Sequence, residues 1–300
     1  MSRENKRLWL KFLSLFSVIR GYNILIITIA QYLASMFIMA HHLPIQEVVL
    51  DPNLFFLVVS TALAIASGYL INNFYDSEKD LINRPKKTLL DNYVSQKTKL
   101  GVYFTLNLLS VIIASYVSFK AVLFFSFYIF ILWLYSHKIK RYPFLGTLTA
   151  GLVAILPFFI IFVYYRNFEA VIIVHAIFLF FIILIRELVK DLENLKGDFT
   201  LDYSTIPVKY NVKFTKRLIS ILVISTIIPA LILVLYFDSG YMDYYFLICV
   251  VLLIFFLFQV WRSDQKIHYL VLHNLLKFVI VLGVFSIVLI DIEAVIRRLF

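Results

Sequence analysis

Two stretches of this 300-residue chain carry closely spaced carboxylate and amide side chains, and each ends a long apolar run. The first, at 70–88, reads LINNFYDSEKDLINRPKKT, and the second, at 186–198, reads RELVKDLENLKGD. In the first stretch Asn72, Asp76 and Asp80 are four residues apart, so a continuous helix would turn their oxygens toward one space. Acidic side chains at membrane depth are costly and usually functional, because their charge needs a partner. Both stretches are therefore candidate functional sites.

A divalent cation is the simplest partner for the two stretches. Oxygen ligands without a His or Cys cluster suit Mg²⁺, which keeps several waters and completes its coordination with substrate phosphates. We therefore expect the stretches to face each other and to hold Mg²⁺ and a diphosphate between them. The predicted metal ligands are Asn72, Asp76, Asp80, Asp191, Asn194 and Asp198. The alternative is that these side chains are solvated charges in loops beyond the helix ends.

At these residues the chain resembles the UbiA family of membrane prenyltransferases. That family's first motif, approximately NDxxDxxxD followed by NRPxR, is matched at six positions: Asn72, Asp76, Asp80, Asn83, Arg84 and Pro85. Asn73 stands where the family usually has Asp, and Lys87 stands where Arg is usual. The second motif, DxxxD, corresponds to Asn194 and Asp198, so its first Asp is also replaced by Asn. The pattern RExxKDxExxxGD is most similar to the branch that prenylates geranylgeranylglyceryl phosphate.

The resemblance implies a Mg²⁺-dependent enzyme that transfers an isoprenyl group, with geranylgeranyl expected, from its diphosphate to a membrane-embedded or interfacial acceptor. The implied catalytic residues are Asp76, Asp80, Asp191 and Asp198. The expected acceptor is geranylgeranylglyceryl phosphate, and an aromatic quinone precursor of the 4-hydroxybenzoate or 1,4-dihydroxy-2-naphthoate type is the alternative. A non-catalytic membrane scaffold or a cation transporter is the alternative from another class. Asn73 and Asn194 bring no charge, so we expect weaker metal binding with activity retained.

Further residues are predicted to bind the diphosphate or the acceptor. Arg20 and Asn23 resemble the family's RPxN-type element, although an interfacial anchor and a helix cap would explain them equally well. The segment YSHKIKRYPFLG at 135–146 is similar to the family's YSxxxKR element, in which Lys140 could neutralise phosphate charge or act only as a topology signal. The complete predicted set is Arg20, Asn23, Asn73, Arg84, Tyr135, Lys140, Arg141 and Lys190.

The composition determines the class of protein. With 62% hydrophobic residues, 15% charged residues and a mean hydropathy of +0.91, the chain is an integral membrane protein that requires a lipid bilayer. The net charge of +10 comes from Lys and Arg in short loops between apolar runs, which is typical of topology signals and argues against nucleic-acid binding. Cys249 is the only cysteine and can form no internal disulfide.

Nine apolar runs have the length that a membrane-spanning helix needs. They lie at about 18–40, 54–75, 100–118, 121–137, 144–165, 168–187, 217–237, 243–261 and 269–290. The sequence therefore predicts an all-α integral membrane protein, with nine transmembrane helices in a bundle around a central cavity. We expect one domain over 1–300, beginning with a basic segment at 1–16. A basic, Pro-containing loop follows each acidic stretch, which suggests two related halves, although chance similarity is the alternative.

The distribution of Lys and Arg predicts the orientation in the membrane. These residues gather before the first run and after the second, fourth, sixth and eighth runs, whereas 41–53 and 238–243 contain none. The positive-inside rule then places the N-terminus and both acidic stretches in the cytoplasm and the C-terminus outside. Arg297 and Arg298 disagree with this orientation. A plasma membrane fits the prediction, and the sequence leaves the oligomeric state undetermined.

Overall fold

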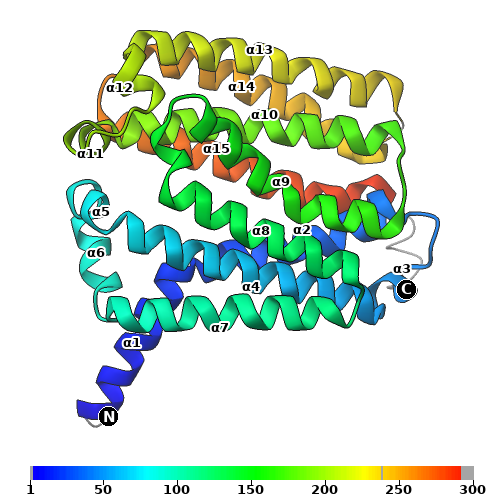
Figure 1. The fold of residues 1–300 in the computed structure, drawn as a ribbon. Coiled ribbons are helices and arrows are strands. Elements are labelled where there is room, and N and C mark those ends of the chain that lie inside the picture. The colour runs from blue at the N-terminus through cyan, green and yellow to red at the C-terminus, as the bar shows by residue number, and fades with distance from the viewer. Residues whose placement is uncertain (1–2, 238, 292–300) are drawn as a thin grey trace.

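The computed structural model describes residues 3–237 and 239–291, and every regular element in them is helical. Nine helices in this part of the chain are long and apolar enough to cross a membrane, and they lie side by side as a bundle (Figure 1). They are α2 (Gly21–Ala34) with its π-helical continuation η1 (Ser35–Met39), α4 (Pro52–Tyr75), α7 (Gln96–Ser115), α8 (Phe119–His137), α9 (Leu145–Tyr165), α10 (Ala170–Glu193), α13 (Val212–Tyr236), α14 (Asp243–Arg262) and α15 (Lys266–Ser286). The predicted all-α bundle is confirmed.

Several boundaries of the spanning helices differ from the sequence prediction, for example at the start of α13, which begins at Val212 rather than at about 217, and two of the differences affect the candidate site. The first spanning helix begins at Gly21 rather than at about 18, because Arg20 has a left-handed backbone conformation with φ 52° and ψ 54° that interrupts the helix. The sixth, α10, extends to Glu193 instead of ending at about 187. Most of the second acidic stretch is therefore helical, which fixes the directions of its side chains.

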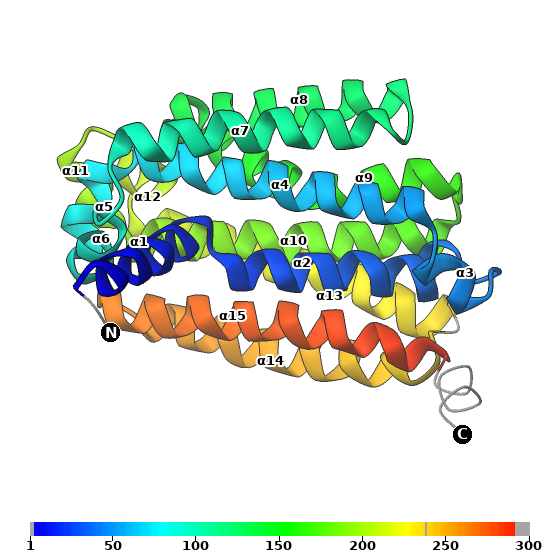
Figure 2. The ribbon, with the colours of Figure 1, turned by 90° about the horizontal axis from the view of Figure 1, so that it is seen from below.

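Short helices connect the long ones at each end of the bundle. Four of them gather at one end (Figure 2): α5 (Ser77–Asn83), α6 (Pro85–Asp91), α11 (Leu195–Thr200) and α12 (Ile206–Tyr210). Pro85 and Pro207 lie in the first turns of α6 and α12, where the missing amide donor of proline is tolerated. The remaining short elements are α3 (Ile45–Val49), η2 (Ile139–Arg141), η3 (Gly240–Met242) and η4 (Ile287–Asp291). Both α4 and α10 are thus followed by a pair of short helices.

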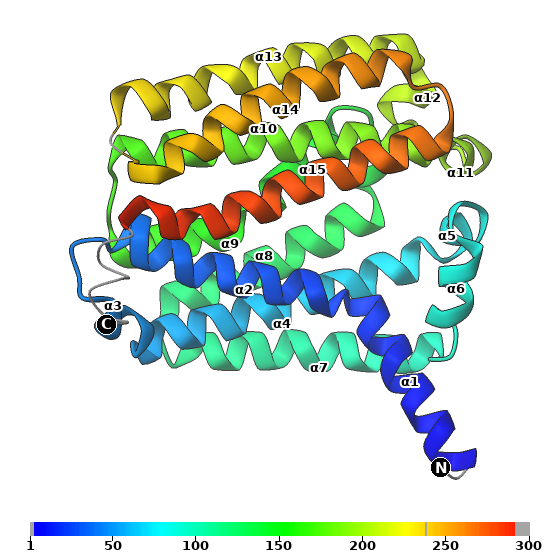
Figure 3. The ribbon, with the colours of Figure 1, turned by 180° about the vertical axis from the view of Figure 1, so that it is seen from behind.

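The basic segment predicted at 1–16 is part of a helix, α1 (Arg3–Ile19), which extends away from the bundle (Figure 3). Phe12 is exposed on α1. Near the C-terminal end of the helix, the Ser17 hydroxyl donates a hydrogen bond of 2.9 Å to a carboxylate oxygen of Asp91. This bond joins α1 to α6. Arg297 and Arg298, which disagreed with the predicted orientation, lie outside the described residues.

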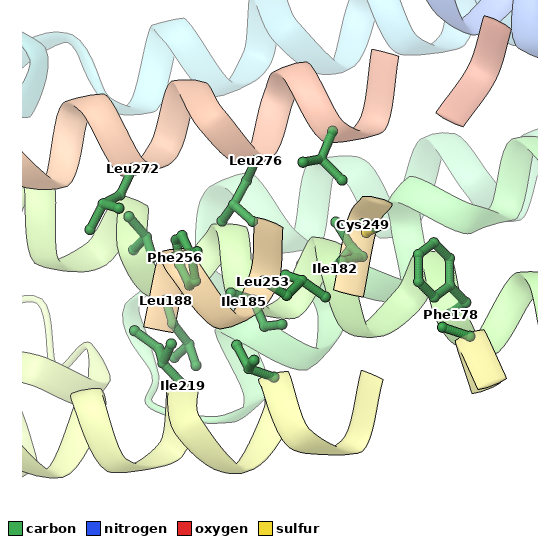
Figure 4. Close-up of a cluster of buried hydrophobic side chains, with 14 of the residues drawn as sticks. Phe178, Ile182, Ile185, Leu188, Ile219, Cys249, Leu253, Phe256, Leu272 and Leu276 are labelled. Carbon is green, nitrogen blue, oxygen red and sulfur yellow. The ribbon is translucent and has the colours of Figure 1, made fainter. Parts of the chain in front are cut away.

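A large apolar core forms where α10 packs against α13, α14 and α15 (Figure 4). Ile185 and Leu188 on α10 are buried there, together with Leu253 on α14 and Leu272 on α15. Cys249 is buried in the same cluster, which is consistent with a packing role. The half of α10 that carries the second acidic stretch is buried at most positions from Ile182 to Glu193, which holds this stretch in place.

Candidate functional site

The last turns of α10 present polar side chains on two neighbouring faces. One face carries Arg186, Lys190 and Glu193, at the i, i+4, i+7 spacing of residues that share one side of a helix. The other face begins one residue later and carries Glu187, Asp191 and Asn194. One residue corresponds to a rotation of about 100° around an α-helix. The two faces therefore belong to adjoining sites, and Glu187 joins them, because its carboxylate lies 2.6 Å from the Lys190 ammonium group and 3.4 Å from the Arg186 guanidinium group.

In the first site, the C-terminal end of α4 meets the segment that follows α8. Lys140 on η2 is buried, and its ammonium group lies 2.7 Å from a carboxylate oxygen of Asp76. The same ammonium group donates a hydrogen bond of 3.1 Å to the side-chain oxygen of Asn72. Asn72 and Asp76 thus point in one direction, as their four-residue spacing predicts.

The second acidic stretch enters the same site through Asp198, whose side chain is completely buried. Lys79, from the first stretch, reaches across to Asp198 with an N–O distance of 2.8 Å. The Thr205 hydroxyl donates a longer bond of 3.4 Å to the other carboxylate oxygen. Lys79 and Arg141 both lie over the ring of Tyr203, at 4.7 and 4.9 Å from its centroid. Cations and carboxylates therefore alternate across the junction of the two stretches.

Asn83 joins α5 directly to α11. Its side-chain oxygen accepts a hydrogen bond of 3.2 Å from the backbone amide of Gly197, and its side-chain nitrogen donates one of 3.4 Å to the backbone carbonyl of Asn194. This contact needs glycine, because a Cβ atom at position 197 would lie 2.3 Å from the Asn83 amide nitrogen. The predicted meeting of the two stretches is thus present in the structure.

Burial and neighbouring charges shift the pKa values of the groups just beyond α4. Burial alone would raise the pKa of Asp76, but the charges of Lys140 and Lys79 outweigh it and hold this pKa below its usual value. Burial would lower the pKa of Lys79, but Asp76 and Asp198 raise it. Burial and the Asp76 charge raise the pKa of Asp80. Asp76 and Lys79 are therefore both charged near neutral pH.

The oxygen donors of this site fit Mg²⁺. Within the described residues, no three His, Cys, Asp or Glu side chains come close enough together to hold a metal ion by themselves. Mg²⁺ does not need such a group, because it typically binds through one or two carboxylates plus substrate phosphates. Carboxylates from both stretches, Asp76 and Asp198, lie at the junction with lysine partners that could instead bind phosphate oxygens.

The second site is a cavity of about 180 Å³ with a strongly basic lining, next to the first site. Its cationic residues are Arg20, Arg84, Lys87, Arg186, Lys190 and Lys277, and its other lining residues are Phe16, Ser17, Tyr22 and His273. No Asp or Glu is among these described lining residues. The cavity is therefore suited to an anion with more than one negative charge.

Glu193 lies behind the basic cavity and binds two of its lining residues. One carboxylate oxygen is 2.9 Å from the Arg84 guanidinium group, and the other is 2.8 Å from Nδ1 of His273. Glu193 therefore connects three segments that are distant in sequence: α10, the α5–α6 junction and α15.

Of the predicted substrate-binding residues, Arg20, Arg84 and Lys190 line the basic cavity, whereas Lys140 and Arg141 are at the first site. Tyr135 also belongs to the first site, because it interacts electrostatically with the acidic side chains of both stretches. The side-chain amide of Asn23 donates a hydrogen bond of 3.1 Å to the Tyr69 hydroxyl. The roles of these predicted residues in binding substrate stay predictions.

Asn73 is the predicted residue that the structure does not bring to either site. Its side-chain oxygen accepts a hydrogen bond of 2.8 Å from Lys99, and its side-chain nitrogen lies 3.3 Å from a carboxylate oxygen of Asp91. The reason is helix rotation: Asn73 follows Asn72 directly, so it points about 100° away around α4. Its amide therefore takes no part in the cluster around Asp76, and the expected weakening of metal binding through Asn73 stays a prediction.

Sequence reasoning missed several residues of the basic cavity, namely Lys87, Arg186, His273 and Lys277, and it missed Lys79 at the first site. Arg186 is one turn before Lys190, and His273 is one turn before Lys277, so each pair is predicted to share a helix face. This four-residue spacing of cationic and His side chains was the feature of the sequence that could have identified them. Nothing in the sequence indicates that the two pairs, which are 87 residues apart (273 − 186 and 277 − 190), line the same cavity.

A large apolar cavity of about 460 Å³ lies farther from the short helices, between α2, α9, α10 and α15. Phe158 and Phe162 line it from α9, Phe178 from α10 and Val284 from α15. These positions are in the half of the bundle that is remote from Asp76 and Asp198. The cavity can accommodate an apolar chain.

Comparison with known proteins agrees with this arrangement. Residues 28–270 match the UbiA prenyltransferase family. A digeranylgeranylglyceryl phosphate synthase from Thermococcus sibiricus is 29% identical over 216 residues, which are 72% of this chain and 75% of that protein. The enzyme of the same name from Methanobrevibacter smithii is 28% identical over 238 residues, which are 75% of this chain and 80% of that protein.

Solved structures share the fold. A structure of digeranylgeranylglyceryl phosphate synthase in membranes superposes with a TM-score of 0.70 and 20% identity, covering 94% of this chain and 99% of that one. A UbiA homolog from Archaeoglobus fulgidus bound to GPP and Mg²⁺ superposes with a TM-score of 0.66 and 13% identity, covering 92% of this chain and 99% of that one.

Proposed function

This chain belongs to the UbiA prenyltransferase family, and we propose that it transfers a geranylgeranyl group from its diphosphate to geranylgeranylglyceryl phosphate. The donor diphosphate binds at the first site, where Asp76 and Asp198 meet. The phosphate of the acceptor binds in the basic cavity. The relatives named digeranylgeranylglyceryl phosphate synthase support this choice of acceptor.

The observation that carries the proposal is the pair of adjoining sites on α10. An enzyme that prenylates a phosphorylated acceptor must bind the donor diphosphate and the acceptor phosphate close together, each in its own site. The first site offers carboxylates for a metal together with lysines for phosphate, whereas the basic cavity is lined by six cations, of which Arg84, Lys87, Arg186 and Lys190 are each ion-paired with a carboxylate. An aromatic acid carries a single carboxylate, so a phosphate monoester matches the charge of this cavity better.

The carboxylates of both stretches would hold Mg²⁺ at the first site: Asp76, Asp80, Asp191 and Asp198, with the amide oxygens of Asn72 and Asn194. When bound, the metal neutralises charge on the diphosphate oxygens as the allylic C–O bond breaks. Lys140 and Lys79 would donate hydrogen bonds to the same oxygens, and the ring of Tyr135 would stabilise positive charge on the carbon that becomes electron-deficient. Asp191 shares its helix face with Asn194 and completes the oxygen-rich wall.

The apolar cavity would hold an isoprenyl tail. Its aromatic and aliphatic lining would exclude water from the tail that it holds. Exclusion of water matters here, because water would capture an allylic cation and release a prenyl alcohol instead of the transfer product.

The charge distribution supports a cytoplasmic location for the reaction. Lys79, Lys87, Lys140 and Lys209 all lie at the bundle end that carries α5, α6, α11 and α12, and the positive-inside rule assigns such an end to the cytoplasm. A plasma membrane fits this orientation. A transporter would place its ion-binding groups near the middle of the spanning helices, whereas the two acidic stretches here lie at the C-terminal ends of α4 and α10.

The proposed function is tested with the full chain reconstituted in liposomes. We expect labelled geranylgeranyl diphosphate to give an ether product with geranylgeranylglyceryl phosphate when Mg²⁺ is present, and none after chelation with EDTA. Product from 4-hydroxybenzoate but not from the glyceryl phosphate would contradict the acceptor assignment. Full activity in EDTA would contradict the role of the metal.

Replacement of Lys277 with glutamine tests whether the basic cavity binds the acceptor. Loss of one charge-assisted hydrogen bond in the cavity is expected to raise KM for the acceptor about tenfold or more, with KM for the donor unchanged. The matched control is Lys213→Gln, the same change at an exposed position on α13 near the same end of the bundle. Steady-state kinetics with each substrate varied in turn gives the result. An equal increase in both KM values would show that the cavity does not distinguish the acceptor.

A further inference from the structure

His273 on α15 has a buried side chain in which the two ring nitrogens have different environments. The residue is 5% exposed. Its Nδ1 atom lies 2.8 Å from a carboxylate oxygen of Glu193, whereas its Nε2 atom is buried and has no hydrogen-bond partner within the described residues. A buried polar atom without a partner is uncommon in a folded protein and calls for an explanation.

The contact with Glu193 determines which ring nitrogen carries the proton. An ionised carboxylate can only accept hydrogen bonds, so Nδ1 must donate its N–H. The other oxygen of Glu193 is bound by the Arg84 guanidinium group at 2.9 Å, which keeps the carboxylate ionised and fixed in position. Nε2 of the neutral ring is left with its lone pair and can accept a proton.

The position of His273 relates this lone pair to both proposed substrates. His273 lines the basic cavity, one helical turn before Lys277. Its partner Glu193 is on the face of α10 that adjoins the face of Asp191 and Asn194. An acceptor whose phosphate binds the cavity cations therefore has its remaining groups beside His273 and near the first site.

We propose that His273 is a catalytic residue, the general base that removes the proton from the acceptor hydroxyl, with Glu193 as the positioning residue that fixes its tautomer. This inference rests on the proposed function. The hydroxyl oxygen forms a new bond to the allylic carbon as the carbon–oxygen bond to diphosphate breaks, and the diphosphate leaves with that electron pair. The hydroxyl proton passes to Nε2 of His273 and is later released to solvent, so the products are the ether, diphosphate and one proton.

Replacement of His273 with asparagine separates this role from a structural one. The asparagine side-chain N–H is placed close to where Nδ1 was and can still donate to Glu193, but nothing replaces Nε2. We expect kcat for transfer to fall between about tenfold and a hundredfold, which is modest for loss of a general base because the attacked carbon is already electron-deficient. Both KM values and the thermal unfolding temperature are expected to stay the same. Donor consumed without transfer appears as prenyl alcohol, and its share is expected to rise.

A second variant keeps the test decisive even if the asparagine variant folds poorly. His273→Gly leaves space in the cavity lining for added imidazole. If His273 is a base, substituted imidazoles restore transfer at rates that increase with their basicity, whereas a ligand that only fills space restores it independently of basicity.

The outcomes distinguish this inference from the proposed function. If the unaltered chain makes no product from geranylgeranylglyceryl phosphate, the proposed function fails. If it makes product and His273→Asn has the same kcat, or if rescue does not depend on basicity, only the assignment of His273 is overturned.

Discussion

Asp198→Asn is expected to lower kcat about a thousandfold, because it removes a charge that we propose binds the metal and the diphosphate. Asp198 is completely buried, and its carboxylate oxygen is 2.8 Å from Lys79. Asparagine has nearly the same shape, so the change removes charge with little change in packing. Lys79 then loses its partner from the second stretch. Steady-state rates with saturating donor and acceptor, at fixed Mg²⁺, give the measurement.

The control for Asp198→Asn is the same replacement at Asp202, four residues later. Asp202 is exposed and has a left-handed backbone with φ 53°, a conformation that asparagine tolerates well. We expect Asp202→Asn to keep the activity of the unaltered chain. If Asp198→Asn also kept it, Asp198 would not be part of the catalytic site. Thermal unfolding of both variants excludes a general loss of fold as the cause.

Gly197→Ala is expected to lower kcat at least about a hundredfold, because it disturbs the contact that joins the two acidic stretches. A Cβ atom at position 197 would lie 2.3, 2.7 and 2.8 Å from three side-chain atoms of Asn83. Asn83 is buried and is held by hydrogen bonds to Gly197 and Asn194, so it cannot swing away without losing both. The alanine must therefore separate α5 from α11, which moves Lys79 away from Asp198.

A double-mutant cycle tests this explanation of the Gly197 effect. Asn83→Ala removes all three atoms that would clash, so Asn83→Ala combined with Gly197→Ala is expected to be more active than Gly197→Ala alone. Gly101→Ala is the control for the substitution itself, because a Cβ atom there meets nothing within 4 Å. If the double variant were no more active than Gly197→Ala, the cause would not be the clash with Asn83.

Local features of the sequence were enough to predict the class of protein and the number of spanning helices. Hydropathy is a property of each segment alone, and a membrane span needs a minimum length of apolar residues. The two motif-bearing stretches were also identified from residue types and spacing. The boundaries were less accurate: α10 continues to Glu193, and Arg20 interrupts the first helix at a residue whose backbone conformation is unusual for a non-glycine residue.

The sequence predicted that the two acidic stretches meet, but it could not predict which individual side chains make contact across distant segments. Asn72 and Asn73 are adjacent and chemically identical, yet one binds Lys140 and the other binds Lys99. The helical period predicts that α10 has two polar faces. It does not predict which neighbouring helix each face contacts. Glu193 and His273 are 80 residues apart and form a hydrogen bond only because α15 packs against α10 in one particular rotation.

The sequence by itself determined that the chain has nine segments long and apolar enough to cross a membrane and carries two oxygen-rich stretches, because helix period and hydropathy depend on near neighbours in the chain. The tertiary structure decided which of those oxygens face each other, which lysines neutralise them, and where a separate basic cavity forms. These outcomes depend on the rotation of each helix in the bundle, and a change of one residue in register turns a side chain by about 100°.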